Sequence, residues 1–197
     1  MALSSDFPAI FDEQIKRLNE RGTPQGIINA LSLKRRLVIN VAYGLNLLPE
    51  RIPFLPVIPQ GKMSIGSQMQ LIRYEQALGY SLLDEKLIHN IAGVPSEPYY
   101  IFDIEDGRTF TDISPYAASA LIKASRREWL VATEAIALCS HTDVLLRHFV
   151  DAMGSRYDHI RKNVHIILEG KTPRINYGFI YDSSPDWGTA SCRFRMK

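Results

Sequence analysis

The sequence has few cysteines, no long apolar run and almost no net charge. Its two cysteines, Cys139 and Cys192, are too few for a disulfide-stabilised scaffold, so we expect reduced thiols and a cytoplasmic protein. The most apolar region, residues 37–48, contains two asparagines and a glycine and is shorter than the roughly 20 residues of a membrane-spanning helix. The formal net charge of +2 gives no reason to expect nucleic acid or a membrane as a partner.

The sequence also lacks the motifs of common cofactor, metal and nucleophile sites. It contains no GxSxG, no CxxC and no glycine-rich dinucleotide fingerprint after a strand. His141 and His148 are seven residues apart, which on one helix is about 10 Å of rise, too far to share one ion. The GKMS stretch at 61–64 lacks the glycine and hydroxyl positions of a phosphate-binding loop. We therefore expect no metal site and no cofactor.

The first half of the chain is dominated by helical patterns. Residues 7–18 place apolar side chains three and four positions apart, which predicts an amphipathic helix that ends near Gly22. Prolines at every third position in PFLPVIP, residues 53–59, predict an extended segment, either a docking peptide or, as we prefer, an edge strand. Further helices are expected at residues 23–48, 67–79, 83–91, 115–123 and 132–140.

Strand patterns begin at residue 99. We expect a hairpin of residues 99–104 and 109–113 around an Asp-Gly turn, and further strands at residues 164–168 and 175–181. The fold class is therefore α+β, with a helical N-terminal half packed on a largely antiparallel sheet formed mainly by residues after 98. We expect one domain over residues 1–197, with residues 1–95 mainly helical and residues 96–197 containing the sheet.

Six segments of the sequence form one set: FDEQIKRLNERG at 11–22, RIPFLPVIP at 51–59, PYYIFDIEDGRTFTDISPYAA at 98–118, TEAIALCSH at 133–141, GSR at 154–156 and GTASC at 188–192. Together they resemble an uncharacterised bacterial family that is known only as a domain of unknown function. The resemblance implies a shared fold but no activity. It departs at residues 181–188, where the family pattern is longer and richer in tryptophan.

Chemically useful side chains are most frequent between residues 149 and 195. Cys192 would act as a nucleophile if His141 or His159 served as its base and its pKa were lowered. Arg156 has the geometry to hold a carboxylate or phosphate. Packing roles for these residues are the alternative at every position. The ligand-binding candidates are Ser155, Arg156, Tyr177, Trp187 and Ser191.

The basic residues after Gly154 exceed the acidic ones and alternate with aromatics. This composition is compatible with single-stranded nucleic acid, but the excess is modest and the alternation in residues 193–197 better suits a sheet edge guarded by charge. We therefore expect a non-catalytic binding or interaction module with a protein or small-molecule partner. The alternative is a small enzyme, a hydrolase or transferase, that uses Cys192 and a histidine.

Overall fold

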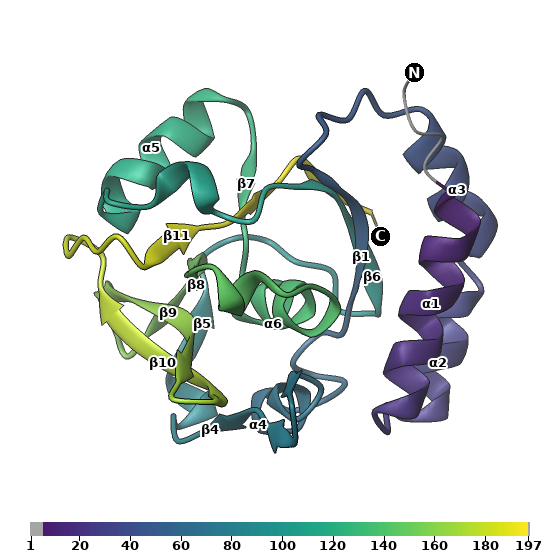
Figure 1. Ribbon diagram of the computed structural model, residues 1–197, viewed down its shortest axis with the longest axis horizontal. Coiled ribbons are helices and arrows are strands. Elements are labelled where there is room, and N and C mark those ends of the chain that lie inside the picture. Colours follow the sequence, from purple (N-terminus) through teal and green to yellow (C-terminus); the bar gives the residue numbers. More distant parts are fainter. Residues whose placement is uncertain (1–5, 197) are drawn as a thin grey trace.

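The computed structural model describes residues 6–196 and has the expected α+β fold, with helices mostly in the N-terminal part (Figure 1). The helices α1, α2 and α3 lie together on one side of strands β1 and β6, and α6 lies on the other side. The α-helices are α1 (Phe7–Glu20), α2 (Gln25–Ser32), α3 (Arg35–Tyr43), α4 (Ile65–Met69), α5 (Pro115–Ala124) and α6 (Ala132–His141). The 3₁₀ turns are η1 (Glu85–Leu87), η2 (Arg108–Phe110) and η3 (Val144–Leu146).

Helix α1 forms where the sequence pattern predicts it. The side chain of Asp6 accepts a hydrogen bond from the backbone N–H of Ala9 at 3.0 Å and so caps the first turn. The helix ends before Gly22, which has a positive φ of 84°. On its outer face, Arg35 of α3 forms two hydrogen bonds of 2.8 Å with Asp12. Arg35 is one of three consecutive basic residues, 34–36, and both Arg35 and Arg36 are exposed.

The strands form two larger sheets and two small pairs. A three-stranded antiparallel sheet has the order β1-β6-β13, and a six-stranded, mixed and curled sheet has the order β11-β8-β9-β10-β4 with β5 paired to β8. The small pairs are β12–β7 and β2–β3. The strands are β1 (Ile52–Val57), β2 (Arg73–Tyr74), β3 (Ala77–Leu78), β4 (Tyr80–Ser81), β5 (Ile88–Asn90), β6 (Tyr99–Ile104), β7 (Glu128–Trp129), β8 (Phe149–Tyr157), β9 (His159–Glu169), β10 (Thr172–Phe179), β11 (Trp187–Thr189), β12 (Ser191–Cys192) and β13 (Phe194–Met196).

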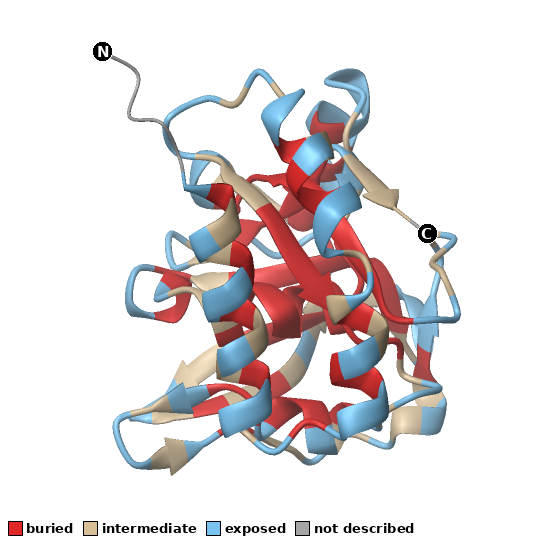
Figure 2. Ribbon diagram, turned by 90° about the vertical axis from the view of Figure 1, so that its right-hand side faces the viewer, coloured by how far each residue is buried: buried red, intermediate tan, exposed pale blue. Residues whose placement is uncertain are grey.

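The three-stranded sheet separates two hydrophobic clusters. Because side chains alternate across a strand, Tyr100 and Phe102 of β6 pack against α1–α3, whereas Tyr99 and Ile101 face α6 and the curled sheet. Figure 2 shows the strands as a buried band behind helices whose outward faces are exposed. The sheet is thus covered on both faces, which leaves its edges as the places where another chain can approach.

The two edges of this sheet differ. On β1, Pro53 and Pro56 remove backbone donors, and the buried Gln14 of α1 donates to the carbonyl of Phe54 at 2.9 Å. The prediction of an edge strand for PFLPVIP is therefore confirmed. Strand β13 forms the other edge, as the charge alternation after residue 193 predicted, and it contains no proline.

Three expected elements differ from the structure. Instead of one helix each, residues 67–79 contain the end of α4 followed by β2 and β3, and residues 83–91 contain η1 followed by β5. Strand β1 also lies in the portion that we expected to be mainly helical. Residues 109–113 do not return as a partner of β6, because both edges of β6 are already paired with β1 and β13. The carboxylate of Glu105 accepts the N–H groups of Gly107 at 3.2 Å and Thr109 at 3.4 Å, which supports the turn into η2 instead.

Candidate functional site

Among the described residues, no hydrogen bond connects Cys192 to His141 or His159, the two candidate bases. Cys192 is fully buried in β12, and burial, followed by the Glu134 carboxylate, raises the pKa of its thiol well above the ordinary value. At the end of α6, burial and the charges of two arginines lower the pKa of His141 to about 3. His159 is exposed on β9 beside the β8–β9 turn. These environments favour a protonated thiol and a neutral His141.

Ser155 and Arg156 on β8 are both held by the protein itself. The Ser155 hydroxyl donates to the side chain of Asn90 at 2.6 Å and accepts from the N–H of Ala132 at 2.8 Å. The guanidinium of Arg156 donates to the carbonyls of Ile160, Met153 and Ser155 at 2.6–3.1 Å. Their contacts therefore fix the start of α6 and the irregular β8–β9 pairing, which is a structural role.

Ser191 belongs to a different network, which surrounds Arg127. Its hydroxyl accepts from Arg127 Nε at 2.9 Å, and Arg127 Nη1 donates to Asp103 Oδ2 at 3.2 Å. Asp103 has a positive φ of 51°, which is uncommon for a residue other than glycine. The contacts of Arg127 therefore connect β12 to the end of β6.

Trp187 and Tyr177 lie on the curled sheet, apart from that network. The ring of Trp187 packs on His165 with centroids 5.1 Å apart, and Tyr177 stacks on Tyr157 at 4.7 Å with 37% of Tyr177 exposed. The aromatic face of β10 is thus divided, because Ile175 enters the core while Tyr177 remains half-exposed. The ligand-binding candidates from the sequence consequently occupy several separate places.

A buried acidic residue of the curled sheet, Asp151, lies beside His165, the residue on which Trp187 packs. Asp151 accepts a hydrogen bond from Asn163 at 2.7 Å, and its carboxylate lies 3.9 Å from His165 Nδ1. Burial raises the pKa of Asp151 to about 7 and lowers the pKa of His165 to about 4. From the sequence alone, this pair is visible only as two polar positions in strand patterns.

The segment DIEDG at 103–107 contributes three buried carboxylates, which we interpreted from the sequence only as a turn. Asp106 accepts from Arg108 at 3.0 Å and from Arg147 at 3.2 Å, and His148 Nε2 lies 3.8 Å away. Burial works to raise the pKa of Asp106, but His148 and Arg108 outweigh it and hold the pKa well below the ordinary value. A pocket of about 170 Å³ beside this cluster is lined by Leu48, Glu50, Arg51, Glu105, Asp106, Arg108 and Thr109.

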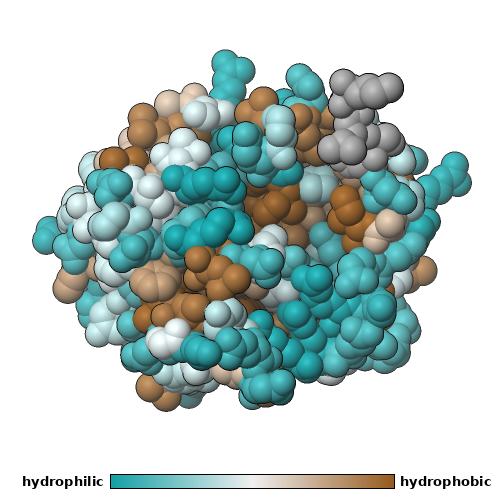
Figure 3. All heavy atoms as spheres, in the orientation of Figure 1, coloured by the Kyte–Doolittle hydropathy of each residue, from teal (hydrophilic) through white to brown (hydrophobic). Residues whose placement is uncertain are grey.

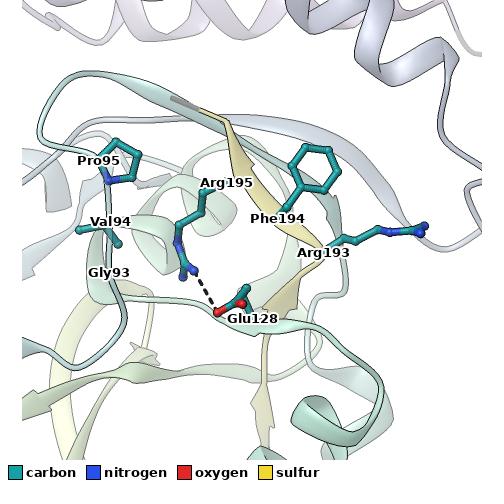
Figure 4. A pocket seen from close by; sticks show the side chains of 7 residues that line it. All are labelled: Gly93, Val94, Pro95, Glu128, Arg193, Phe194 and Arg195. Carbon is teal, nitrogen blue, oxygen red and sulfur yellow. Dashed lines mark hydrogen bonds and ion pairs between the residues drawn. The ribbon is translucent and has the colours of Figure 1, made fainter.

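The face of the molecule drawn in Figure 3 has no single broad apolar patch among the described residues. In the orientation of Figure 1, hydrophobic side chains gather in small patches between hydrophilic ones (Figure 3). The pocket drawn in Figure 4 has a volume of about 540 Å³, within the usual range of ligand sites. Strand β13 forms one wall, and the loop 93–95 forms the other. Its lining residues are Gly93, Val94, Pro95, Glu128, Arg193, Phe194 and Arg195.

Arg195 forms the base of this pocket and is anchored from within. Its Nε and Nη2 donate to the two oxygens of the fully buried Glu134 at 2.6 and 2.8 Å, and Nη2 also donates to the carbonyl of Trp129. Its Nη1 has only a 3.5 Å contact, with the exposed carboxylate of Glu128 (Figure 4). Arg195 is therefore a rigid cation with one donor that is weakly engaged.

A second pocket, of about 510 Å³, lies on the other side of Val94 and Pro95 and includes Lys34, Ser96 and Glu97. Glu97 pairs with Lys62 at 2.6 Å. Within residues 6–196, neither Lys34 nor Arg193 has an ion-pair partner. Lys34 and Arg193 are thus cations without an ion-pair partner, whereas the charge of Arg195 is already balanced by Glu134 and Glu128.

Comparison with known proteins adds no assignment: no family model, no curated protein and no solved structure matches this chain. In the part of the chain that the structure describes, no group of three or more His, Cys, Asp and Glu side chains is placed to hold a metal ion. No helix within residues 6–196 has the length and apolar character needed to cross a membrane.

Proposed function

We propose that this protein is a non-catalytic binding module that holds an anionic group of a protein or small-molecule partner in the pocket of Figure 4. The observation that carries the proposal is an open pocket with Arg193 at its rim and one weakly engaged donor, Nη1, on Arg195; the two side chains point in different directions (Figure 4). Arg193 has no ion-pair partner among the described residues, and Arg195 presents Nη1 beside an exposed carboxylate. An incoming anion can replace Glu128 at that donor without breaking the buried contacts to Glu134.

The anchoring of Arg195 supports a binding role in a second way. A long cationic side chain normally loses rotamer freedom when it binds a ligand. The two bonds to Glu134 and the bond to the Trp129 carbonyl already fix the Arg195 guanidinium. Binding at Nη1 therefore costs little additional ordering, which favours affinity.

The enzyme alternative has less support from the structure. It requires a reactive thiolate, and burial of Cys192 raises the pKa of that group. Both free cysteines are buried, which agrees with a thiol-reducing, cytoplasmic setting. A binding function requires neither thiol to react.

A nuclear magnetic resonance titration of the ¹⁵N-labelled protein tests the proposal. We use succinate as the anionic probe and 1,4-diaminobutane as a cationic control of similar length. Succinate is expected to shift the backbone resonances of residues 93–95 and 193–195 saturably, and the diamine is not.

The matched variants are Arg193→Ala in the pocket and Arg161→Ala, which removes an exposed arginine outside it. Loss of one exposed charge contact of at most about 1 kcal/mol corresponds to roughly threefold to fivefold weaker binding of succinate. Arg161→Ala should leave the affinity unchanged. Shifts that never saturate, or that are equally large with the diamine, would contradict the proposal.

A further inference from the structure

The pocket of Figure 4 lies beside a free strand edge. From Ser191 to Met196 the chain runs along β6 on one side, through the Glu105–Ser191 bridge, the 2.9 Å bond from the N–H of Arg193 to Phe102, and the β13–β6 pairing. On the other side, β12 pairs with β7. Strand β13 has no second partner among residues 6–196.

The edge is free because the chain before β7 turns away. The N–H of Arg127 bonds to the carbonyl of Ile122 at the end of α5, so the segment that precedes Glu128 does not continue along β13. The space that β7 fills beside β12 is therefore open beside β13, and it corresponds to the pocket between β13 and residues 93–95.

Building on the proposed function, we propose that the partner presents an extended peptide segment with acidic side chains, which adds to β13 as a fourth strand of the sheet. Strand addition satisfies the backbone groups of an exposed edge and takes its specificity from alternating side chains. β13 has three residues, which at about 3.3 Å per residue gives a short ladder of roughly 10 Å. Side-chain contacts must therefore supply much of the specificity.

The charges that line the two pockets beside Val94 and Pro95 favour acidic side chains in the peptide. Of the two carboxylates there, Glu97 pairs with Lys62 and Glu128 contacts Arg195, whereas Lys34 and Arg193 have no ion-pair partner in the described chain. Alternate residues of an added strand point to opposite faces of the sheet. Acidic residues on one face of the peptide would lie near the arginines, and apolar residues would contact Val94 and Phe194.

A second copy of this chain is a poorer occupant of the edge. Pairing two β13 strands would bring Arg193 and Arg195 of one copy against the same residues of the other, and like charges across a strand pair are destabilising. Pairing β13 with the opposite edge of a second copy is also disfavoured, because Pro53, Pro56 and Gln14 block β1. A separate acidic peptide avoids both difficulties.

The experiment measures binding of a fluorescein-labelled peptide, Thr-Val-Glu-Val-Glu-Val-Thr, with a blocked C-terminus, by fluorescence anisotropy. Replacement of both glutamates by lysine is expected to weaken binding at least tenfold. Two further versions carry N-methyl groups either on the glutamate amides or on the valine amides. Because an added strand bonds to the edge only through alternate residues, one methylated version should lose at least tenfold in affinity and the other should bind nearly normally.

Glycine substitutions provide matched protein variants. A Cβ atom added at Gly93 or at Gly26 meets no other heavy atom within 4 Å, and neither glycine has a positive φ, so both variants should fold. Gly93→Glu introduces a competing carboxylate into the pocket and should weaken peptide binding at least tenfold. Gly26→Glu adds the same charge on α2 and should change it less than twofold.

The outcomes separate the two proposals. Binding of succinate without binding of the acidic peptide, or equal binding of all methylated peptides, overturns strand addition and leaves the proposed function intact. Failure of succinate and of every peptide to bind overturns both. Self-association that Gly93→Glu abolishes, measured by sedimentation, would identify a second copy as the occupant and overturn the peptide proposal.

Discussion

The buried ion pair of Glu134 and Arg195 allows a prediction whose magnitude follows from its contacts. Glu134 is fully buried, and besides Arg195 its carboxylate accepts from the Tyr99 hydroxyl at 2.8 Å and from the N–H of Val131 at 2.9 Å. Burial works to lower the pKa of Arg195, but the hydrogen bonds to Glu134 outweigh it and raise the pKa. Arg195 therefore remains charged over the ordinary pH range.

Glu134→Gln keeps the shape of the side chain but removes its charge and one acceptor. An amide nitrogen then faces a donor, either an Arg195 N–H or the backbone N–H of Val131, and the arginine loses its counterion. Removal of one partner of a buried pair costs about 3–5 kcal/mol. We expect Glu134→Gln and Arg195→Met each to lower the free energy of unfolding by that amount, and Tyr99→Phe to lower it by about 1.5–3 kcal/mol.

Urea denaturation followed by tryptophan fluorescence and circular dichroism provides the measurement. The double variant Glu134→Gln/Arg195→Met should be at least about 2 kcal/mol more stable than the sum of the single effects predicts, because neither leaves a charge without its partner. Asp12→Asn, which breaks the exposed pair with Arg35, is the control and should change stability far less. Single effects below about 1 kcal/mol, or strictly additive ones, would refute the reasoning.

Three further outcomes are expected. Burial raises the pKa of Asp151 from the ordinary value of 3.8 to about 7 in the folded protein, so the unfolded chain releases this proton at lower pH. The contribution of protonated Asp151 to the free energy of unfolding therefore falls as pH rises from about 4 to 7. In urea denaturation at a series of pH values, Asp151→Asn should gain up to about 4 kcal/mol of stability relative to wild type over this range. Iodoacetamide should label Cys139 and Cys192 equally slowly near pH 7, because burial raises the pKa of both thiols. Rapid labelling of Cys192 alone, detected by mass spectrometry, would instead support the enzyme alternative. Gly188→Ala should lower the thermal midpoint by an amount equivalent to at least about 2 kcal/mol, because its Cβ would lie 2.5 Å from the carbonyl oxygen of Gly107; an unchanged midpoint would show that this contact relaxes freely.

Local chemistry made much of the fold predictable. The helices expected at residues 7–18 and 115–123 both formed. The strand expected at residues 175–181 formed as well but ends at Phe179. The proline spacing of PFLPVIP and the charges after residue 193 also identified both edges of one sheet. In these segments the side chains that determine the local structure are neighbours in sequence.

The missed features depend on long-range contacts. Residues 83–91 have a helix-like pattern, but Ile88 enters the core when β5 pairs with β8, more than sixty residues later in the chain. The candidate pocket was missed for the same reason, because Glu128, Val94 and Arg195 come together only when three separate segments meet. The expected thiol–imidazole pair required convergence that one sequence cannot reveal, and the surroundings of Cys192 place other groups beside it.

The strand pairings of residues 187–196 have a consequence for folding. This short segment adds β11 to the curled sheet, β12 to β7 and β13 to β6, so three sheets gain a strand from it. Pairings between residues so distant in sequence form slowly. Until they form, the Tyr99–Ile104 strand has an unpaired edge and an uninterrupted run of large apolar side chains from Tyr99 to Phe102, a combination that favours aggregation. Refolding yield should therefore fall steeply as protein concentration rises.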